Sequence, residues 1–177
     1  LRREIAKVTI ENLIKDGRIH PGRIEELYDK TCKEIHSKII EKGQDATFNL
    51  GISKIDPELV ETIGKLHFRT SYGQNVLKHS IEVANLTGLL ASEIGENITL
   101  AKRAGLFHDI GKVTEMKFGV YQPESIVTHR YLGIEFLYPF KDYIIENYSS
   151  EWWYNLVSIF LQHHGEFEDD CRTLPAL

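Results

Sequence analysis

Apolar residues recur every three or four positions along most of the chain, which is the period of an α-helix. Two such stripes occupy residues 1–16 and 21–43, and each is followed or closed by a glycine that can end a helix. Alternation with a period of two, typical of half-buried strands, is nearly absent. The pattern therefore predicts an all-α protein, folded as a helical bundle with short connections.

Capping residues and helix breakers divide the rest of the chain. The further helices that they predict are 56–64, which begins with Asp56-Pro57; 71–94, stopped by Gly95; 99–107, capped by Thr99; a helix from His129 to about Phe140; and 151–164, capped by Ser149 or Ser150. The stripe in 71–94 places Leu90 and Ile94 on the buried face. Residues 46–51 are expected to form a loop, and residues 113–126 a loop or short hairpin.

Composition indicates one compact globular domain. The chain has 177 residues, of which 42% are hydrophobic and 27% are charged, enough to bury a real core. Cys32 and Cys171 lie far apart without CxxC spacing, so a reducing, cytoplasmic compartment is expected and a disulfide framework is not. No apolar run approaches the roughly 20 residues of a membrane helix.

The net charge of −5 is unevenly distributed. After Lys141 the only basic residue is Arg172, whereas seven acidic residues follow in the same stretch. This excludes a protein that binds nucleic acid by counterion release alone. An RNA substrate would have to be held by a metal and a local Arg/Lys cluster, or by a separate domain.

The most informative motif is His108-Asp109 in the run GLFHDIGK, preceded 29 residues earlier by His79. An imidazole nitrogen and a carboxylate oxygen suit a borderline or hard divalent cation such as Mn²⁺, Fe²⁺, Zn²⁺ or Mg²⁺. Gly111 can end the helix in a left-handed conformation, which would leave Asp109 and Lys112 near an exposed turn. Two helices could thus present three ligands, with a hydrogen-bonded structural cluster as the alternative.

Other residues are candidates for the same site. His129 and His163 are further metal ligands in this interpretation, although His129 could equally donate to a carbonyl at a helix start; His164 is a weaker candidate. Lys112 and Arg69 could neutralise phosphate charge. Tyr72 and Gln74, close to Arg69 and His79, are predicted to contact a substrate unless they only stabilise a loop.

A set of neighbouring aromatic residues admits two interpretations. Trp152, Trp153, Tyr154 and Tyr148 could stack on bases of a single strand, but their acidic surroundings favour core packing.

The runs RTSYGQN (69–75) and HDIGK (108–112) closely resemble the ribonuclease Y family of the HD superfamily, and DGRIHPGRIEE (16–26) is similar to the segment that joins its KH and HD domains. The resemblance implies an HD-domain bundle at residues 61–177, lacking its last helix, after an N-terminal helical extension at 1–60. It implies a metal-dependent endoribonuclease acting on single-stranded RNA in mRNA decay. From the residues themselves, we expect His108, Asp109 and Lys112 to be catalytic and His79, His108, Asp109, His129 and His163 to bind the metal.

Family members also carry a membrane anchor, a coiled coil and a KH domain, and their metal motif ends in an aspartate on a late helix, which is expected to lie just beyond this chain. The match is weaker after residue 113. A phosphohydrolase acting on nucleotides or cyclic dinucleotides therefore stays an alternative, as does an inactive regulatory module. The charged face of residues 21–43 is typical of a solvated surface, with a homodimer contact as the alternative.

Overall fold

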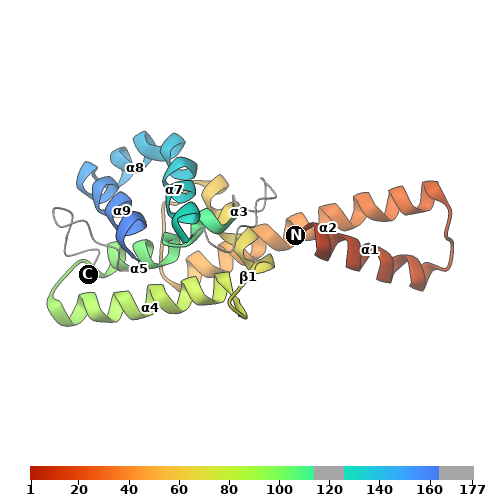
Figure 1. Cartoon of the computed structure of the whole chain (residues 1–177), viewed down its shortest axis with the longest axis horizontal. Helices are drawn as coiled ribbons and strands as arrows, with labels where there is room; N and C mark the ends of the chain where they lie inside the picture. Colours follow the sequence, from red (N-terminus) through yellow and green to blue (C-terminus); the bar gives the residue numbers. More distant parts are fainter. Residues whose placement is uncertain (114–125, 164–177) are drawn as a thin grey trace.

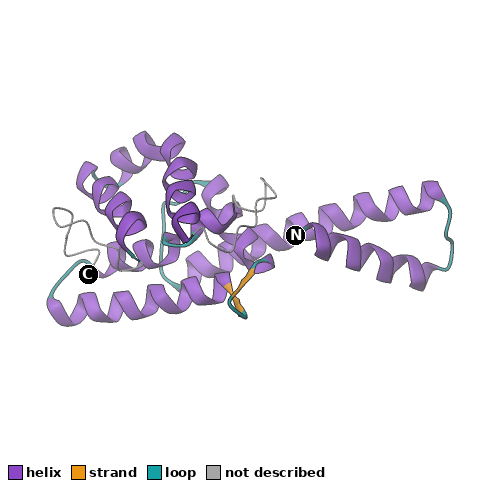
Figure 2. Cartoon of the chain, in the orientation of Figure 1, coloured by secondary structure: helices purple, strands orange, loops and turns teal. Residues whose placement is uncertain are grey.

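The computed structural model describes residues 1–113 and 126–163, and most of them are helical, as the sequence predicted (Figure 2). The elements, labelled in Figure 1 where space allows, are α1 (Arg2–Asp16), α2 (Pro21–Asn49), α3 (Pro57–Lys65), η1 (Leu66–Phe68), β1 (Thr70–Ser71), β2 (Gln74–Asn75), α4 (Val76–Ile94), α5 (Ile98–Phe107), η2 (Ile110–Val113), α7 (Ile126–Leu137), η3 (Tyr138–Phe140), α8 (Lys141–Asn147) and α9 (Ser150–Gln162). The loop or hairpin predicted around residues 113–126 lies almost wholly outside the described residues.

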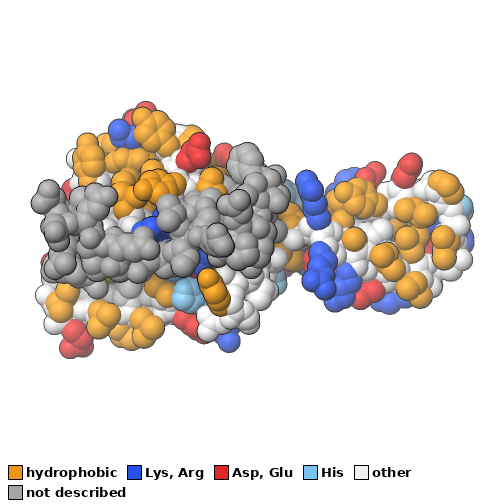
Figure 3. All heavy atoms as spheres, in the orientation of Figure 1, with side chains coloured by type: hydrophobic (Ala, Val, Ile, Leu, Met, Phe, Trp, Pro, Cys, Tyr) orange, Lys and Arg blue, Asp and Glu red, His pale blue; other side chains and the backbone are white. Residues whose placement is uncertain are grey.

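Helices α1 and α2 form an antiparallel hairpin that projects from the rest of the molecule (Figure 1). Gly17 takes a left-handed φ of 73° at the end of α1, as its position predicted. Asp16 then accepts hydrogen bonds from Arg18 and Arg23, which fastens the connection. Because two helices can bury only their facing sides, Ile10 and Ile14 stay exposed. Figure 3 shows apolar side chains over this projection and Lys and Arg side chains grouped at its base.

The second helix does not end at Gly43, contrary to the sequence prediction, but continues to Asn49. A Cβ on Gly43 would lie 2.0 Å from the Val60 carbonyl oxygen, and one on Gly64 would lie 1.8 Å from the Ile39 carbonyl oxygen. Both glycines therefore allow the backbones of α2 and α3 to touch, and Gly43 does not end its helix. The predicted loop at 46–51 is accordingly helical over most of its length.

A two-residue hairpin leads into α4, and the periodicity of the sequence does not predict it. Thr70 pairs with Asn75 and Ser71 with Gln74, and the turn between them has positive φ at Tyr72 (48°) and Gly73 (80°). Two residues per strand are too few to show a period of two. The hairpin makes α4 begin at Val76 instead of Ser71, with Asn75 accepting from the Lys78 amide as its cap.

The core lies where α3, α4, α5 and α7–α9 meet. Its largest fully buried side chains include Ile63, Leu66, Leu106, Leu137 and Phe160. The predicted domain boundary at 60/61 falls inside α3. Among the described residues, no helix is both long and apolar enough to span a membrane.

Two local predictions around α4 and α5 were wrong. Asn97 caps α5 by accepting from the Leu100 amide, two residues before the predicted cap Thr99. Leu90 and Ile94 are each 65% exposed, because the face of α4 that packs on α5 carries the small residues Ala84, Gly88 and Ala91 instead. The packing is closest at Gly105, where a Cβ would lie 2.7 Å from the Ala84 Cα.

Candidate metal centre

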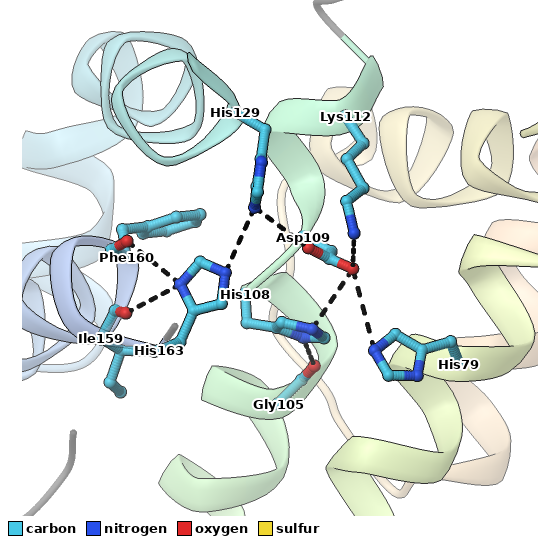
Figure 4. A network of polar contacts seen from close by, with 9 residues as sticks. All are labelled: His79, Gly105, His108, Asp109, Lys112, His129, Ile159, Phe160 and His163. Carbon is cyan, nitrogen blue, oxygen red and sulfur yellow. Dashed lines mark hydrogen bonds and ion pairs between the residues drawn. The ribbon is translucent and has the colours of Figure 1, made fainter. Parts of the chain in front are cut away.

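Helix α4 and the end of α5 bring His79, His108 and Asp109 together, as the motif spacing predicted (Figure 4). The His108 Nε2 lies 3.3 Å from Asp109 Oδ2, and the His79 Nε2 lies 3.9 Å from the same oxygen. One nitrogen or oxygen from each residue lies within 4.8 Å of the others. A single cation could therefore reach all three.

The other carboxylate oxygen of Asp109 faces a second group. His129 on α7 places its Nε2 3.6 Å from Asp109 Oδ1, and 3.3 Å from the His163 Nε2 at the end of α9. Donor atoms of Asp109, His129 and His163 again lie within 4.8 Å of one another. Asp109 thus lies between two sets of imidazoles. The cluster as a whole brings together residues up to 84 positions apart in the sequence.

Backbone carbonyls orient two of these rings. The Nδ1 of His108 donates to the Gly105 oxygen at 2.7 Å, and the Nδ1 of His163 is 3.1 Å from the oxygens of both Ile159 and Phe160. A carbonyl oxygen can only accept, so Nδ1 carries the hydrogen in each ring. Nε2 is then directed at the cluster, the usual arrangement of a metal-binding histidine.

Asp109 is buried, although the sequence pattern predicted a position near an exposed turn. Its side chain is 2% exposed, and Lys112 Nζ lies 2.6 Å from Oδ2. Burial by itself raises the pKa of Asp109, but the interaction with His108 and the charge of Lys112 outweigh it and hold that pKa well below its ordinary value. The carboxylate is therefore ionised. Burial and repulsion from His108 lower the pKa of His79, which favours its neutral, metal-binding form.

Gly111 is not a left-handed helix end, because its φ is not among the positive values of the described residues. A Cβ here would lie 1.9 Å from the His129 carbonyl oxygen. One turn further along α7, a Cβ on Gly133 would lie 2.4 Å from the Phe160 ring. The two glycines set how closely η2, α7 and α9 approach, and hence how close His129 comes to Asp109.

The remaining candidates lie in different surroundings. Tyr72 is 92% exposed at the hairpin turn and Gln74 is exposed beside it, so neither enters the buried cluster. Arg69 is half-buried just before β1. His164 lies outside the described residues.

Trp152 and Trp153 are buried in the core, which fits the core-packing interpretation over a base-stacking platform. Tyr148 lies under the Arg103 guanidinium, 4.1 Å from ring centroid to Cζ, while Tyr154 is exposed.

The donor set fits a divalent metal. Imidazole nitrogens with one carboxylate are ligands for Mn²⁺, Fe²⁺ or Zn²⁺, and Mg²⁺ prefers more oxygen. Each oxygen of Asp109 already faces a different set of nitrogens.

Comparison with known proteins agrees with this geometry. The family model described as HD domain matches residues 76–176. The chain is 48% identical over 168 residues to a protein named Ribonuclease Y from Latilactobacillus sakei, covering 95% of this chain and 29% of that protein. It is 53% identical over 142 residues to Ribonuclease Y 1 of Pediococcus pentosaceus, covering 80% and 26%. Ribonuclease Y of Listeria monocytogenes is 46% identical over 168 residues, covering 95% and 29%.

The chain thus spans less than a third of the length of these relatives. No solved structure matches it.

Proposed function

Because this chain belongs to the HD domain family, we propose that it is the catalytic part of a metal-dependent endoribonuclease that hydrolyses single-stranded RNA in mRNA decay. The observation that carries the proposal is the buried, ionised Asp109 between two sets of imidazoles. The similarity to proteins named Ribonuclease Y supports RNA as the substrate.

The proposal assigns the cluster residues as follows. His79, His108 and Asp109 hold one divalent ion, and His129 and His163 extend the site to a second, sharing Asp109. Bound ions of this kind supply an activated water and stabilise charge on the phosphate. The nitrogen-rich donor set favours Mn²⁺, Fe²⁺ or Zn²⁺ over Mg²⁺.

Lys112 contributes positive charge beside the site. Without substrate it pairs with Asp109 at 2.6 Å, and we propose that its ammonium group turns to a phosphate oxygen when RNA binds. Arg69, just before the hairpin that leads to the helix of His79, and Tyr72 and Gln74 on that hairpin would guide the RNA strand. The exposure of Tyr72 and Gln74 suits contact with a polymer better than enclosure of a small nucleotide.

The wider setting of this domain follows from the resemblance. We propose that residues 1–60 join the HD domain at 61–177 to a preceding KH domain, and that the full-length protein works in the cytoplasm, anchored at the membrane. We propose that it acts as a homodimer.

Cleavage assays with matched substrates test the function. The wild type, Asp109→Asn and His36→Ala are incubated with Mn²⁺ and an end-labelled RNA, the same sequence as DNA, a cyclic dinucleotide and a nucleoside monophosphate. His36 is an exposed histidine near Glu61, outside the metal cluster, and serves as the control. Internal RNA cleavage by the wild type and His36→Ala, absent in Asp109→Asn, is expected.

Other outcomes point to other functions. Turnover of the nucleotide or cyclic dinucleotide without RNA cleavage would identify a small-molecule phosphohydrolase. Metal binding without turnover, also in the longer protein, would identify a regulatory module.

A further inference from the structure

Arg130 follows His129 on α7 and is almost completely buried, at 5% exposure. Its Nη1 donates a hydrogen bond of 2.6 Å to the carbonyl oxygen of Leu161, near the end of α9. Leu161 stands two residues before His163. The bond thus joins the neighbour of one candidate ligand to the turn that carries the other.

The position of His163 depends on that turn. Helix α9 ends at Gln162, so the Leu161 carbonyl is one of the last four, which have no amide partner within the helix. The Nδ1 of His163 bonds to its own helix end, at the oxygens of Ile159 and Phe160. Last turns fray readily, and a charge-assisted bond from a buried arginine opposes this.

We propose that Arg130 is a positioning residue that holds the end of α9 so that His163 faces His129 and Asp109. It ties α7 to α9 where the Nε2 atoms of His129 and His163 lie 3.3 Å apart. Gly133 and Phe160 set how closely the two helices pack, and Arg130 fixes the last turn along the helix axis. This role of Arg130 rests on the proposed metal function only where metal binding is measured.

Arg103 provides a matched control. It is also buried, at 7% exposure, and its Nη2 donates to a backbone carbonyl, that of Ser53, at 2.8 Å. The Ser53 carbonyl lies in the segment between α2 and α3, and neither Ser53 nor Arg103 belongs to the cluster. Arg130→Met and Arg103→Met therefore remove the same kind of bond at two places. Arg130→Lys keeps the positive charge, and its donor group stands on a shorter side chain.

Two measurements on the whole chain separate positioning from general stability. Imidazole ¹⁵N–¹H NMR spectra, recorded without metal, report which nitrogen of His163 carries the hydrogen, and titration with Mn²⁺ gives its affinity. Arg130→Met is expected to change the His163 signals from one Nδ1–H form to a mixture of tautomers, and to weaken Mn²⁺ binding about 10- to 100-fold. Arg130→Lys should fall between it and the wild type, and Arg103→Met should match the wild type in both.

The results also distinguish the two proposals. Wild-type His163 signals and Mn²⁺ affinity in Arg130→Met would overturn the role of Arg130. If neither the wild type nor any variant binds metal, the metal function is overturned. The His163 signals would still test the positioning role of Arg130. If Arg130→Met does not fold, Arg130→Lys decides alone, since unchanged His163 signals in that variant would also overturn the proposal.

Discussion

Gly111→Ala is the substitution that tests most directly how the metal centre is assembled. Gly111 lies in η2, two residues after Asp109, and a Cβ there would lie 1.9 Å from the His129 carbonyl oxygen and 2.7 Å from the Gly133 nitrogen. Both atoms belong to the backbone of α7 and cannot rotate away. Real Cβ atoms essentially never approach another heavy atom closer than 3.0 Å, so α7 must move away from η2 by about 1 Å.

Gly111→Ala is expected to lower both the stability of the fold and its affinity for Mn²⁺. Forcing a methyl group into packed backbone destabilises by about 1–3 kcal/mol. For a domain of this size, about 2–4 °C of melting temperature is lost for each kcal/mol, so the expected drop is about 2–12 °C. Because His129 moves with α7, Mn²⁺ affinity should also fall, by about 10- to 100-fold, as for other changes that displace a ligand.

The assay combines thermal unfolding, followed by circular dichroism, with Mn²⁺ titration. Gly43→Ala is the matched control, since its Cβ would lie 2.0 Å from the Val60 carbonyl oxygen on α3, outside the cluster; it should lose stability but keep Mn²⁺ affinity. Gly88→Ala should cost less stability than Gly111→Ala, because the nearest atoms belong to the Lys102 side chain and not to backbone, and because alanine favours helix by about 1 kcal/mol. A Gly111→Ala protein with wild-type melting temperature and Mn²⁺ affinity would show that α7 is not held in place by this contact.

Three further predictions rest on single contacts. Lys112→Ala should keep Mn²⁺ binding but slow RNA cleavage, because it removes the proposed phosphate contact; an unchanged rate and salt dependence would contradict that role. Hydrogen bonds from Arg23 lower the pKa of Asp16, so the hairpin connection is stabilised above the unfolded pKa of about 3.9 and loses this stabilisation as the pH falls below it. The protection factors of the amides at residues 13–23, corrected for the intrinsic pH dependence of exchange, should fall at acid pH, and much less so in Asp16→Asn, which already lacks the ion pair. Asn97→Ala should cost about 1 kcal/mol in unfolding experiments and Thr99→Ala much less, because Asn97 is the cap of α5; equal costs would show that the cap bond contributes little.

Predictions from the sequence succeeded where the signal is local. Gly17 and Gly95 both end helices in the left-handed region, and Asp56 and Ser149 both cap the helices that they were expected to begin. Such features depend on a few neighbouring residues and on backbone conformations that glycine or a short polar side chain favours. The motif around His108 likewise indicates the candidate ligands, because donor chemistry is a property of the residues themselves.

Predictions failed where the same residue types act over long distances. Gly43 and Gly111 were interpreted as helix ends, but each lies where another helix touches its backbone. Nothing within a few residues of a glycine tells these two uses apart. The exposure of Leu90 and the burial of Asp109 were missed for the same reason, since both depend on which helix packs alongside.

The helical class, most helix ends and the identity of the residues able to bind a metal can be derived from the chain's residues alone, because period, capping and donor chemistry are properties of short segments. Helix packing, in contrast, buries Asp109 against Lys112 and turns each of its oxygens to a different set of histidines. Packing also places Arg130, which no sequence motif marks, on the carbonyl of Leu161. These relations join residues far apart in the chain, and they are fixed by how closely helices pack and by the low polarity of the interior, which makes each buried charge depend on its partners.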